Sequence, residues 1–183
     1  MTATAIRRAR LTDVPSMMVL LNEYARQAEI LPRTEADVYQ SIRDWVVAEQ
    51  GEQIVGMGAL LIMWQDLAEI RSLVIDPACQ GQGIGRHLVA ALVDEAKSLE
   101  LPRVFALTRK PGFFLKIGFG LTRIEDLPRK VQKDCVFCPK FHACDEVAVI
   151  MPLVEKPVAA PQIEETLATN GIAAAHVIPL ISA

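Results

Sequence analysis

Three glycines at alternate positions form the part of the chain best suited to bind a phosphate group. Gly81, Gly83 and Gly85 follow Asp76-Pro77 and lead directly into a run of apolar residues at helical spacing. Because glycine has no Cβ and tolerates a positive φ angle, successive backbone amides can turn toward one anion at the positive end of a helix. The segment therefore predicts a cradle for a diphosphate.

The spacing of this loop distinguishes it from two common nucleotide-binding motifs. The loop lacks the two-residue gap before the last glycine of the dinucleotide fingerprint, and it lacks the Gly-Lys-Ser/Thr of a P-loop. Glycine loops also cap helices for purely structural reasons. The loop alone therefore leaves two interpretations open, a binding site and a structural cap.

A second cluster of reactive side chains lies further along the chain. Cys135, Cys138, His142 and Cys144 bring four soft or borderline metal ligands close together in sequence. The first pair has the spacing of a zinc knuckle, but the second pair follows without the usual separate turn. A zinc site at these four residues and a reduced structural cluster both stay open. A cysteine nucleophile is not expected, because no base pairs with a particular thiol.

Strands and helices alternate in an order that would place the loop at the end of a buried strand. Thr12 and Thr34 are each expected to cap a helix, the latter in a capping box with Asp37. The helix after the loop has an apolar stripe comprising Ile84, Leu88, Ala91, Leu92, Ala96 and Leu99. A further helix is expected over 111–117, and strands over 4–11, 45–49, 53–64, 67–75, 103–107, 119–124 and 146–154.

The bulk properties limit the function classes. The chain has 183 residues with 51% apolar content, which suits one domain over 1–154 followed by an Ala- and Pro-containing tail over 155–183. A net charge of −3 gives no basic footprint for nucleic acid. The longest apolar stretch, 54–64, is shorter than the roughly 18 residues that span a membrane. Without a secretory signal at the N-terminus, a cytoplasmic protein is expected.

The run Gln80-Gly81-Gln82-Gly83-Ile84-Gly85-Arg86 resembles the Q/R-x-x-G-x-G/A signature of the GNAT acetyltransferases. The resemblance extends over about 4–154 and implies an α/β fold with a mixed, mostly antiparallel sheet flanked by helices. It also implies acetyl-CoA as the acetyl donor. The donor-binding residues that it implies are Leu73, Val74, Ile75, Gln80, Gly81, Gln82, Gly83, Ile84, Gly85, Arg86, Thr108, Phe113 and Phe114.

The same resemblance implies a direct transfer without an acyl-enzyme. Glu69 stands where many of these enzymes have a general base, and the backbone amide of Val74 would stabilise the oxyanion. An alternative for Glu69 is a simple ion pair with Arg71 on the same face of the strand. The family often has a tyrosine acid where this chain has Phe114. A thiol with a pKa of about 8.5 can nevertheless leave as a thiolate.

Several short strings, among them Ile30-Leu31-Pro32-Arg33, resemble short-form N-acetylglutamate synthases. This likeness implies transfer to the α-amino group of glutamate, a step of arginine biosynthesis. The likeness also implies that Arg33 binds the α-carboxylate, a role that suits its planar fork. The alternative is a solvated arginine before a helix cap. The further candidates for substrate binding are Arg71, Ser72, Lys130 and Lys133.

Two alternatives remain beside glutamate acetylation. The acceptor could be glutamine, another amino acid, a polyamine or a protein amine. A chain of a different class would be an acyl-CoA-binding sensor that uses the segment 135–144 as a metal or redox switch. In either case the sequence predicts a small-molecule partner rather than nucleic acid or a membrane, and it is compatible with a homodimer.

Overall fold

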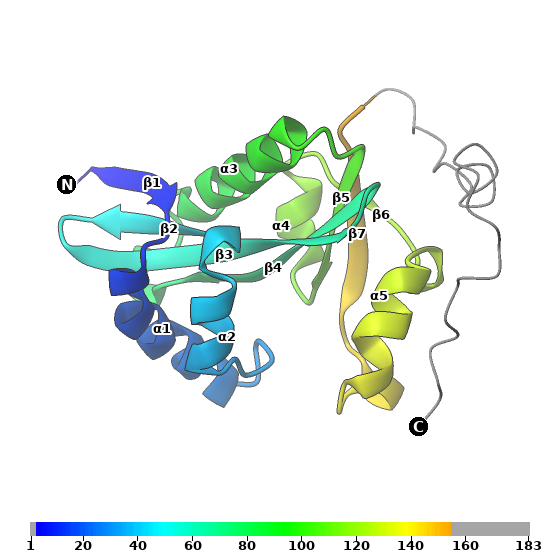
Figure 1. The fold of residues 1–183 in the computed structure, drawn as a ribbon, viewed down its shortest axis with the longest axis horizontal. Coiled ribbons are helices and arrows are strands. Elements are labelled where there is room, and N and C mark those ends of the chain that lie inside the picture. The colour runs from blue at the N-terminus through cyan, green and yellow to red at the C-terminus, as the bar shows by residue number, and fades with distance from the viewer. Residues whose placement is uncertain (1–2, 155–183) are drawn as a thin grey trace, which may run out of the picture.

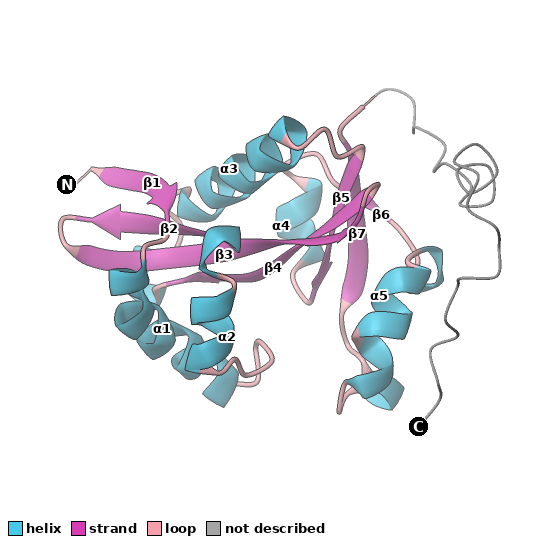
Figure 2. Ribbon diagram, viewed as in Figure 1, coloured by secondary structure: helices cyan, strands magenta, loops and turns pink. Residues whose placement is uncertain are grey.

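One mixed sheet runs through residues 3–154, the part of the chain that the computed structural model describes. The strands are β1 Thr4–Arg8, β2 Trp45–Gln50, β3 Gln53–Trp64, β4 Leu67–Ile75, β5 Arg103–Thr108, β6 Gly120–Leu121 and β7 Val147–Pro152. The helices are α1 Val14–Arg26, α2 Glu35–Gln40, α3 Ile84–Ser98, α4 Pro111–Leu115 and α5 Pro128–Lys133 (Figures 1 and 2). The expected tail over 155–183 lies outside the described residues.

The order of the strands confirms the predicted sheet. It runs β1-β2-β3-β4-β5-β7-β6, and every neighbouring pair is antiparallel except β4 and β5. Helices α3 and α4 cover one face of the sheet, whereas α1, α2 and α5 lie on the other (Figure 1). Both faces of the central strands are therefore buried, which explains why these strands are apolar without a clean alternation.

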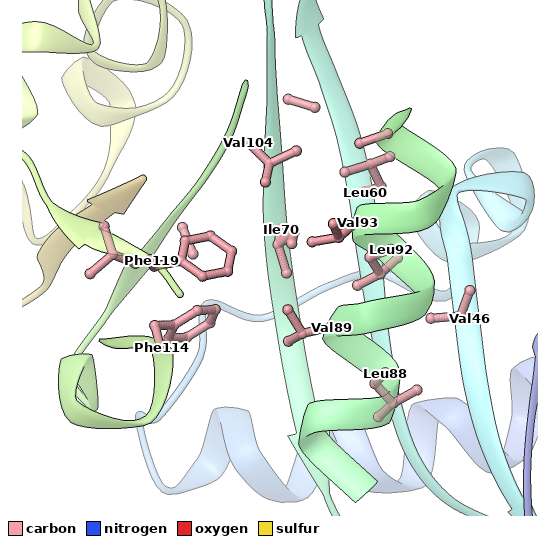
Figure 3. Close-up of a cluster of buried hydrophobic side chains, with 14 of the residues drawn as sticks. Val46, Leu60, Ile70, Leu88, Val89, Leu92, Val93, Val104, Phe114 and Phe119 are labelled. Atoms are coloured by element: carbon pink, nitrogen blue, oxygen red, sulfur yellow. The ribbon is translucent and has the colours of Figure 1, made fainter. Parts of the chain in front are cut away.

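Helix α3 follows the glycine loop and packs its apolar stripe on the sheet. Its buried residues are Ile84, Leu88, Val89, Leu92, Val93 and Ala96, which face Val46, Leu60, Ile70 and Val104 of the strands (Figure 3). The expected stripe is confirmed except at Leu99, which is 50% exposed. Leu99 is the C-cap, where the chain already turns away from the sheet.

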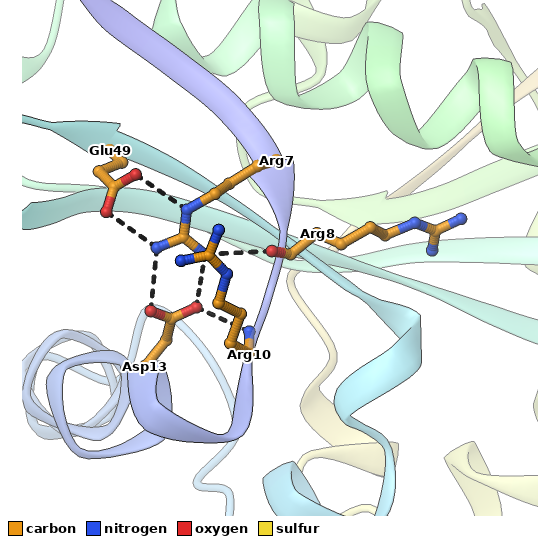
Figure 4. A network of polar contacts seen from close by, with 5 residues as sticks. All are labelled: Arg7, Arg8, Arg10, Asp13 and Glu49. Atoms are coloured by element: carbon orange, nitrogen blue, oxygen red, sulfur yellow. Dashed lines mark hydrogen bonds and ion pairs between the residues drawn. The ribbon is translucent and has the colours of Figure 1, made fainter.

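The entry to α1 differs from the prediction, whereas the entry to α2 agrees with it. Thr12 does not cap α1, because a 3-10 turn over Leu11–Asp13 precedes the helix, which begins at Val14. Asp13 instead accepts a hydrogen bond from Arg7, whose guanidinium lies between the carboxylates of Asp13 and Glu49 (Figure 4). At α2, the Thr34 hydroxyl accepts from the Asp37 amide, and the Asp37 carboxylate accepts from the Thr34 amide. That capping box is confirmed.

The segment after β5 contains the largest departure from the expected elements. Helix α5 was not anticipated, because its six residues contain a single aliphatic position, Val131, and so give no apolar period. The strand expected over 119–124 shortens to Gly120–Leu121, and the helix expected over 111–117 ends at Leu115. Helix α5 lies beside β7 (Figure 1).

Strands β4 and β5 separate after a short parallel contact. Within the described residues, their ladder consists of Ala68–Val104 and Glu69–Phe105, although β4 continues to Ile75. On its other side, β4 has a bulge opposite β3, where Ser72 adopts a positive φ of 53°. Bulges of this kind re-aim side chains and often lie beside active sites. The divergence leaves the edge of β4 open.

In residues 3–154, every helix is too short or too polar to cross a lipid bilayer.

Candidate active site

A cleft of about 1250 Å³ lies between the diverging strands β4 and β5. Its wall also includes the glycine loop, the loop before α2, and parts of α4 and α5. The structure brings together most of the predicted site residues here, namely Arg33, Glu69, Arg71, Ser72, Leu73, Ile75, Gln80, Gly81, Gly83, Ile84, Gly85, Arg86, Thr108, Phe113, Phe114, Lys130, Cys135, Cys138 and Cys144.

Four predicted residues do not line the cleft. Val74 is 1% exposed, and its side chain packs against α1 on the far side from the cleft lining. Gln82 directs its amide toward the Ala78 carbonyl and the Gln50 side chain. Lys133 and His142 are exposed outside the cleft, and the His142 ring stacks edge-on against Phe141.

The glycine loop has the geometry that its sequence predicts. Gly81 and Gly83 have φ angles of 77° and 81°, in the region that favours glycine. Gly83 is the N-cap of α3, and the backbone amides of residues 81–85 have no acceptor within the described residues. Gly85 lies so close to the Phe113 ring that an added Cβ would meet it at 3.3 Å. The loop thus presents free donors at the positive end of a helix, which suits a diphosphate.

Tyr24 of α1 fixes the start of this loop and was not anticipated as a site residue. Its hydroxyl donates to the Ile75 carbonyl at the end of β4 and accepts from the Gln80 amide. No pattern in the sequence indicated this polar contact across 51 residues. The Gln80 side chain therefore also serves to hold the loop against β4.

Two arginines form a cationic region at one end of the cleft. Arg33 Nε donates to Ser72 Oγ at 3.3 Å, and Arg71 Nε is buried without a partner among the described residues. Within residues 3–154, neither guanidinium forms an ion pair. Burial, and then the neighbouring Arg71 charge, lower the pKa of Arg33. Two adjacent cations without an ion-pair partner in the described part of the chain are suited to an anion.

Glu69 is engaged by Lys130 rather than by Arg71, so the simple Glu69–Arg71 pair is wrong. Lys130 Nζ lies 2.9 Å from both carboxylate oxygens of Glu69 and 2.8 Å from Asp134 Oδ2. Glu69 and Lys130 are 3% and 9% exposed. Burial alone would lower the pKa of Lys130, but Glu69 and Asp134 outweigh that effect, and the net direction is upward. Lys130 therefore stays charged.

A second carboxylate, Glu146, lines the cleft just before β7 and was not anticipated as a functional residue. Its side chain is open to the cleft and makes no hydrogen bond or ion pair within the described residues. The surrounding cleft walls, and then the charge of Glu69, raise the pKa of Glu146. Side chains alternate between the two faces of a strand, so Glu146, just before β7, lies on the same face of the sheet as Ala148 and Ile150.

The cysteines give no support to zinc. In residues 3–154, no group of three or more His, Cys, Asp or Glu side chains is arranged to hold a metal ion. All four cysteines of the chain are free thiols, and His142 does not line the cleft that Cys135, Cys138 and Cys144 line. Burial raises the pKa of Cys135. The reduced cluster is the interpretation that fits the geometry.

The two phenylalanines of α4 have different surroundings. Phe114 is 5% exposed and packs edge-on against Phe113 and Phe119, with ring centroids 5.0 and 5.1 Å apart. Phe113 is half-buried and touches the glycine loop at Gly85. Phe114 is thus mainly a core residue, and Phe113 offers the larger surface to a ligand.

Comparison with known proteins identifies the family. The model of the acetyltransferase (GNAT) family matches residues 14–119, more than half of the chain. An uncharacterized N-acetyltransferase of Chlorobaculum tepidum is 35% identical over 150 residues, which cover 82% of this chain and 97% of the relative. An amino-acid acetyltransferase of Mycobacterium tuberculosis is 40% identical over 126 residues, 67% of this chain and 71% of the relative.

A solved structure agrees at the level of the fold. The N-acetylglutamate synthase of Neisseria gonorrhoeae, complexed with coenzyme A and N-acetyl-glutamate, matches with a TM-score of 0.76 and 24% identity. The match covers 85% of this chain and 36% of that chain. With the family match, the two relatives, the diverging strands and the glycine loop all in agreement, the chain belongs to the acetyltransferase (GNAT) family and is an N-acetyltransferase.

Proposed function

We propose that the enzyme transfers the acetyl group of acetyl-CoA to the α-amino group of L-glutamate. The observation that carries this proposal is the pair of arginines, Arg33 and Arg71, which line the cleft without an acidic partner among the described residues. A dicarboxylic amino acid supplies two anions to such a site, whereas a neutral amino acid supplies one and a polyamine none. The acetyl donor and the acceptor are supported by separate parts of the cleft.

The glycine loop supports acetyl-CoA as the donor. Free amides at residues 81–85 lie at the N-terminus of the 15-residue helix α3, and Arg86 lines the cleft beside them. These donors suit the diphosphate of the carrier, and the open edge of β4 lies along the route from there to Glu69. The crystal structure of the Neisseria gonorrhoeae synthase in complex with coenzyme A adds a relative of the same fold.

The cationic end of the cleft supports an acidic acceptor. Arg33 has already lost part of its hydration, and Ser72 occupies only its Nε, which leaves the terminal guanidinium nitrogens for a carboxylate. Arg71 adds a second cation two residues along β4 from Glu69. The Mycobacterium tuberculosis relative is named amino-acid acetyltransferase, and the Neisseria structure contains N-acetyl-glutamate, so both support an amino acid as the acceptor.

The chemistry that we propose is a direct attack in a ternary complex. The amine nitrogen forms a bond to the thioester carbonyl carbon, the carbon–sulfur bond breaks, and the thiol leaves as a thiolate. The Asp76 amide donates to Val55 of β3, and Val74, two residues earlier, presents its amide on the same side of β4. The oxyanion would therefore meet a backbone amide on the open edge of β4 rather than that of Val74. Glu69 is almost completely buried, which leaves little of its surface for direct contact with the substrate. We therefore propose that it accepts the proton of the substrate ammonium through a water molecule.

Glutamate acetylation would place the enzyme in arginine biosynthesis, in the cytoplasm, where both substrates are available. A homodimer stays a prediction, which size-exclusion chromatography with light scattering can test.

The specificity of the enzyme tests the proposal. We expect kcat/KM for L-glutamate to exceed that for L-glutamine by about 10²-fold, because the neutral amide leaves a buried guanidinium without its counter-charge. The release of free thiol from acetyl-CoA measures both rates. Equal or faster turnover of glutamine would reject glutamate as the acceptor, and tight acetyl-CoA binding without turnover of any amine would favour the sensor.

A further inference from the structure

Lys130 contacts two carboxylates at once from the short helix α5. Its Nζ is 2.9 Å from Glu69 Oε1, 2.9 Å from Glu69 Oε2 and 2.8 Å from Asp134 Oδ2. The Lys130 side chain is 11% exposed and that of Glu69 is 5% exposed. Three donors on one ammonium are thus directed to two acidic partners, which leaves the lysine little capacity for another anion.

The charges in this group argue against a substrate carboxylate at Lys130. One ammonium with two carboxylates carries a local net charge of −1. A third carboxylate would have to enter a region that is already negative, at a cost that grows with burial. Arg33 and Arg71, which have no acidic partner within residues 3–154, present the opposite sign in the same cleft.

The two charged groups together match the two ends of an amino acid. The arginine pair attracts carboxylates, whereas the Glu69–Lys130–Asp134 group attracts an ammonium. Asp134 is four residues after Lys130 at the end of α5, so it can hold the lysine in place without touching β4. The lysine in turn sets the position of the Glu69 carboxylate.

We propose that Lys130 is a positioning residue that acts through Glu69 and is itself anchored by Asp134, rather than a ligand of the substrate carboxylate. Lys130 joins α5 to β4 and holds the Glu69 carboxylate toward the place where the acceptor amine must lose its proton. This inference deepens the proposed function, because it rests on Glu69 serving that amine.

The test compares Lys130→Met with Lys130→Arg and with Arg129→Met. Arg129 is the preceding cation on α5, its guanidinium stacks over the Trp64 ring 4.0 Å from the centroid, and it does not line the cleft. We expect Lys130→Met to lower kcat about 10²-fold while KM for L-glutamate changes less than about threefold. The same loss of kcat should appear with any second amine that the wild-type enzyme acetylates. Lys130→Arg should recover at least about tenfold, and Arg129→Met should match the wild-type enzyme.

The opposite kinetic pattern would overturn the inference. If Lys130→Met raised KM for L-glutamate more than about tenfold with kcat unchanged, Lys130 would be a substrate ligand. Circular dichroism and acetyl-CoA titration check the fold of each variant. If Lys130→Met does not fold, Asp134→Asn serves instead and should lower kcat more than it raises KM, and an unchanged kcat would reject the anchor. Wild-type turnover of another amine in place of glutamate would contradict the proposed acceptor alone, whereas no turnover of any amine would contradict both.

Discussion

Arg33 Nε donates a hydrogen bond to Ser72 Oγ over 3.3 Å, which joins the loop before α2 to the bulge in β4. The contact brings together segments that are 39 residues apart in the chain. It places the Arg33 guanidinium beside Arg71, whose Nε is buried without a partner among the described residues. The cationic end of the cleft is therefore built by the bulge as much as by the arginines.

Replacing Arg33 tests this region directly. We expect Arg33→Ala to raise KM for L-glutamate by about 10- to 100-fold, because a charge-assisted hydrogen bond to a carboxylate is lost. The effect on kcat should be smaller, and KM for acetyl-CoA should not change. Steady-state thiol release with each substrate varied in turn measures the three constants.

Arg43→Ala is the matched control for Arg33. Arg43 is an exposed cation in the 3-10 turn after α2, and it does not line the cleft. Similar increases in KM for both variants would assign the effect to the overall charge of the protein and would contradict a specific carboxylate contact.

Gly83 tests the phosphate cradle. Its φ is 81°, and an added Cβ would have no protein atom within 4 Å, so Gly83→Ala suffers backbone strain but no clash within the protein. We expect a loss of about 1 to 2 kcal/mol in the free energy of unfolding. We also expect acetyl-CoA to bind at least about tenfold more weakly by calorimetry, because the methyl group and the altered backbone disturb the amides that face the diphosphate.

Gly51 offers a matched control, since its φ is 63° and its Cβ would also meet no atom within 4 Å. It lies in the turn between β2 and β3 and does not line the cleft. Gly51→Ala should therefore lose similar stability and keep its affinity for acetyl-CoA. Equal affinities in the two variants would argue that the glycine loop is a structural cap.

Features that depend on residues close together in the chain were predictable from the sequence, whereas contacts between distant segments were not. The glycine loop, the Thr34–Asp37 capping box and the strand over 67–75 were predictable, because each depends on residues close together in the chain. Helix α5 was not, since a single turn or two of polar residues has no apolar period. That helix carries Lys130, so the ion pair of the lysine with Glu69 could not be foreseen.

The site residues show the same division. Glu69, Arg33 and the loop glycines came from local motifs, and the structure places them in one cleft. The partners of Glu69 and Tyr24 are 61 and 51 residues away, and their identity depends on how helices pack over the sheet. Leu99 likewise fits the stripe of α3 by spacing, but it lies at the C-cap, where the helix has passed the edge of the core.

Asp13 makes a pH-dependent contribution to stability. The Arg7 side chain, by its hydrogen bonds, lowers the pKa of Asp13 below that of an unfolded aspartate. Stability from this pair is thus complete above the unfolded pKa of about 3.9 and is lost as the pH falls through the folded pKa. We expect Asp13→Asn to lower the unfolding free energy by about 1.5 to 3 kcal/mol at pH 7.

Urea unfolding at several pH values checks this prediction. The difference between the wild-type protein and Asp13→Asn should shrink below about pH 4. Asp94→Asn, an exposed residue 3.9 Å from Lys97, should change stability by less than about 0.5 kcal/mol at every pH. A difference for Asp13→Asn that persisted unchanged to pH 2 would exclude the ion pair as its source.

Phe113 and Phe114 should separate donor binding from packing. Phe114→Ala removes a ring that is 5% exposed in the core, and we expect it to cost about 3 to 5 kcal/mol in unfolding free energy. Phe113→Ala removes a half-buried ring, so it should cost less and instead weaken acetyl-CoA binding. Thermal unfolding and calorimetry measure the two effects, and the reverse assignment would show that Phe114 is the donor contact.

A competition among acceptors tests the central claim most directly. The enzyme is incubated with acetyl-CoA and an equimolar mixture of the twenty amino acids, and the acetylated products are identified by mass spectrometry. The cationic cleft predicts N-acetyl-L-glutamate as the dominant product. Dominance of any acetylated amino acid without a side-chain carboxylate, or the absence of any acetylated product, would contradict it.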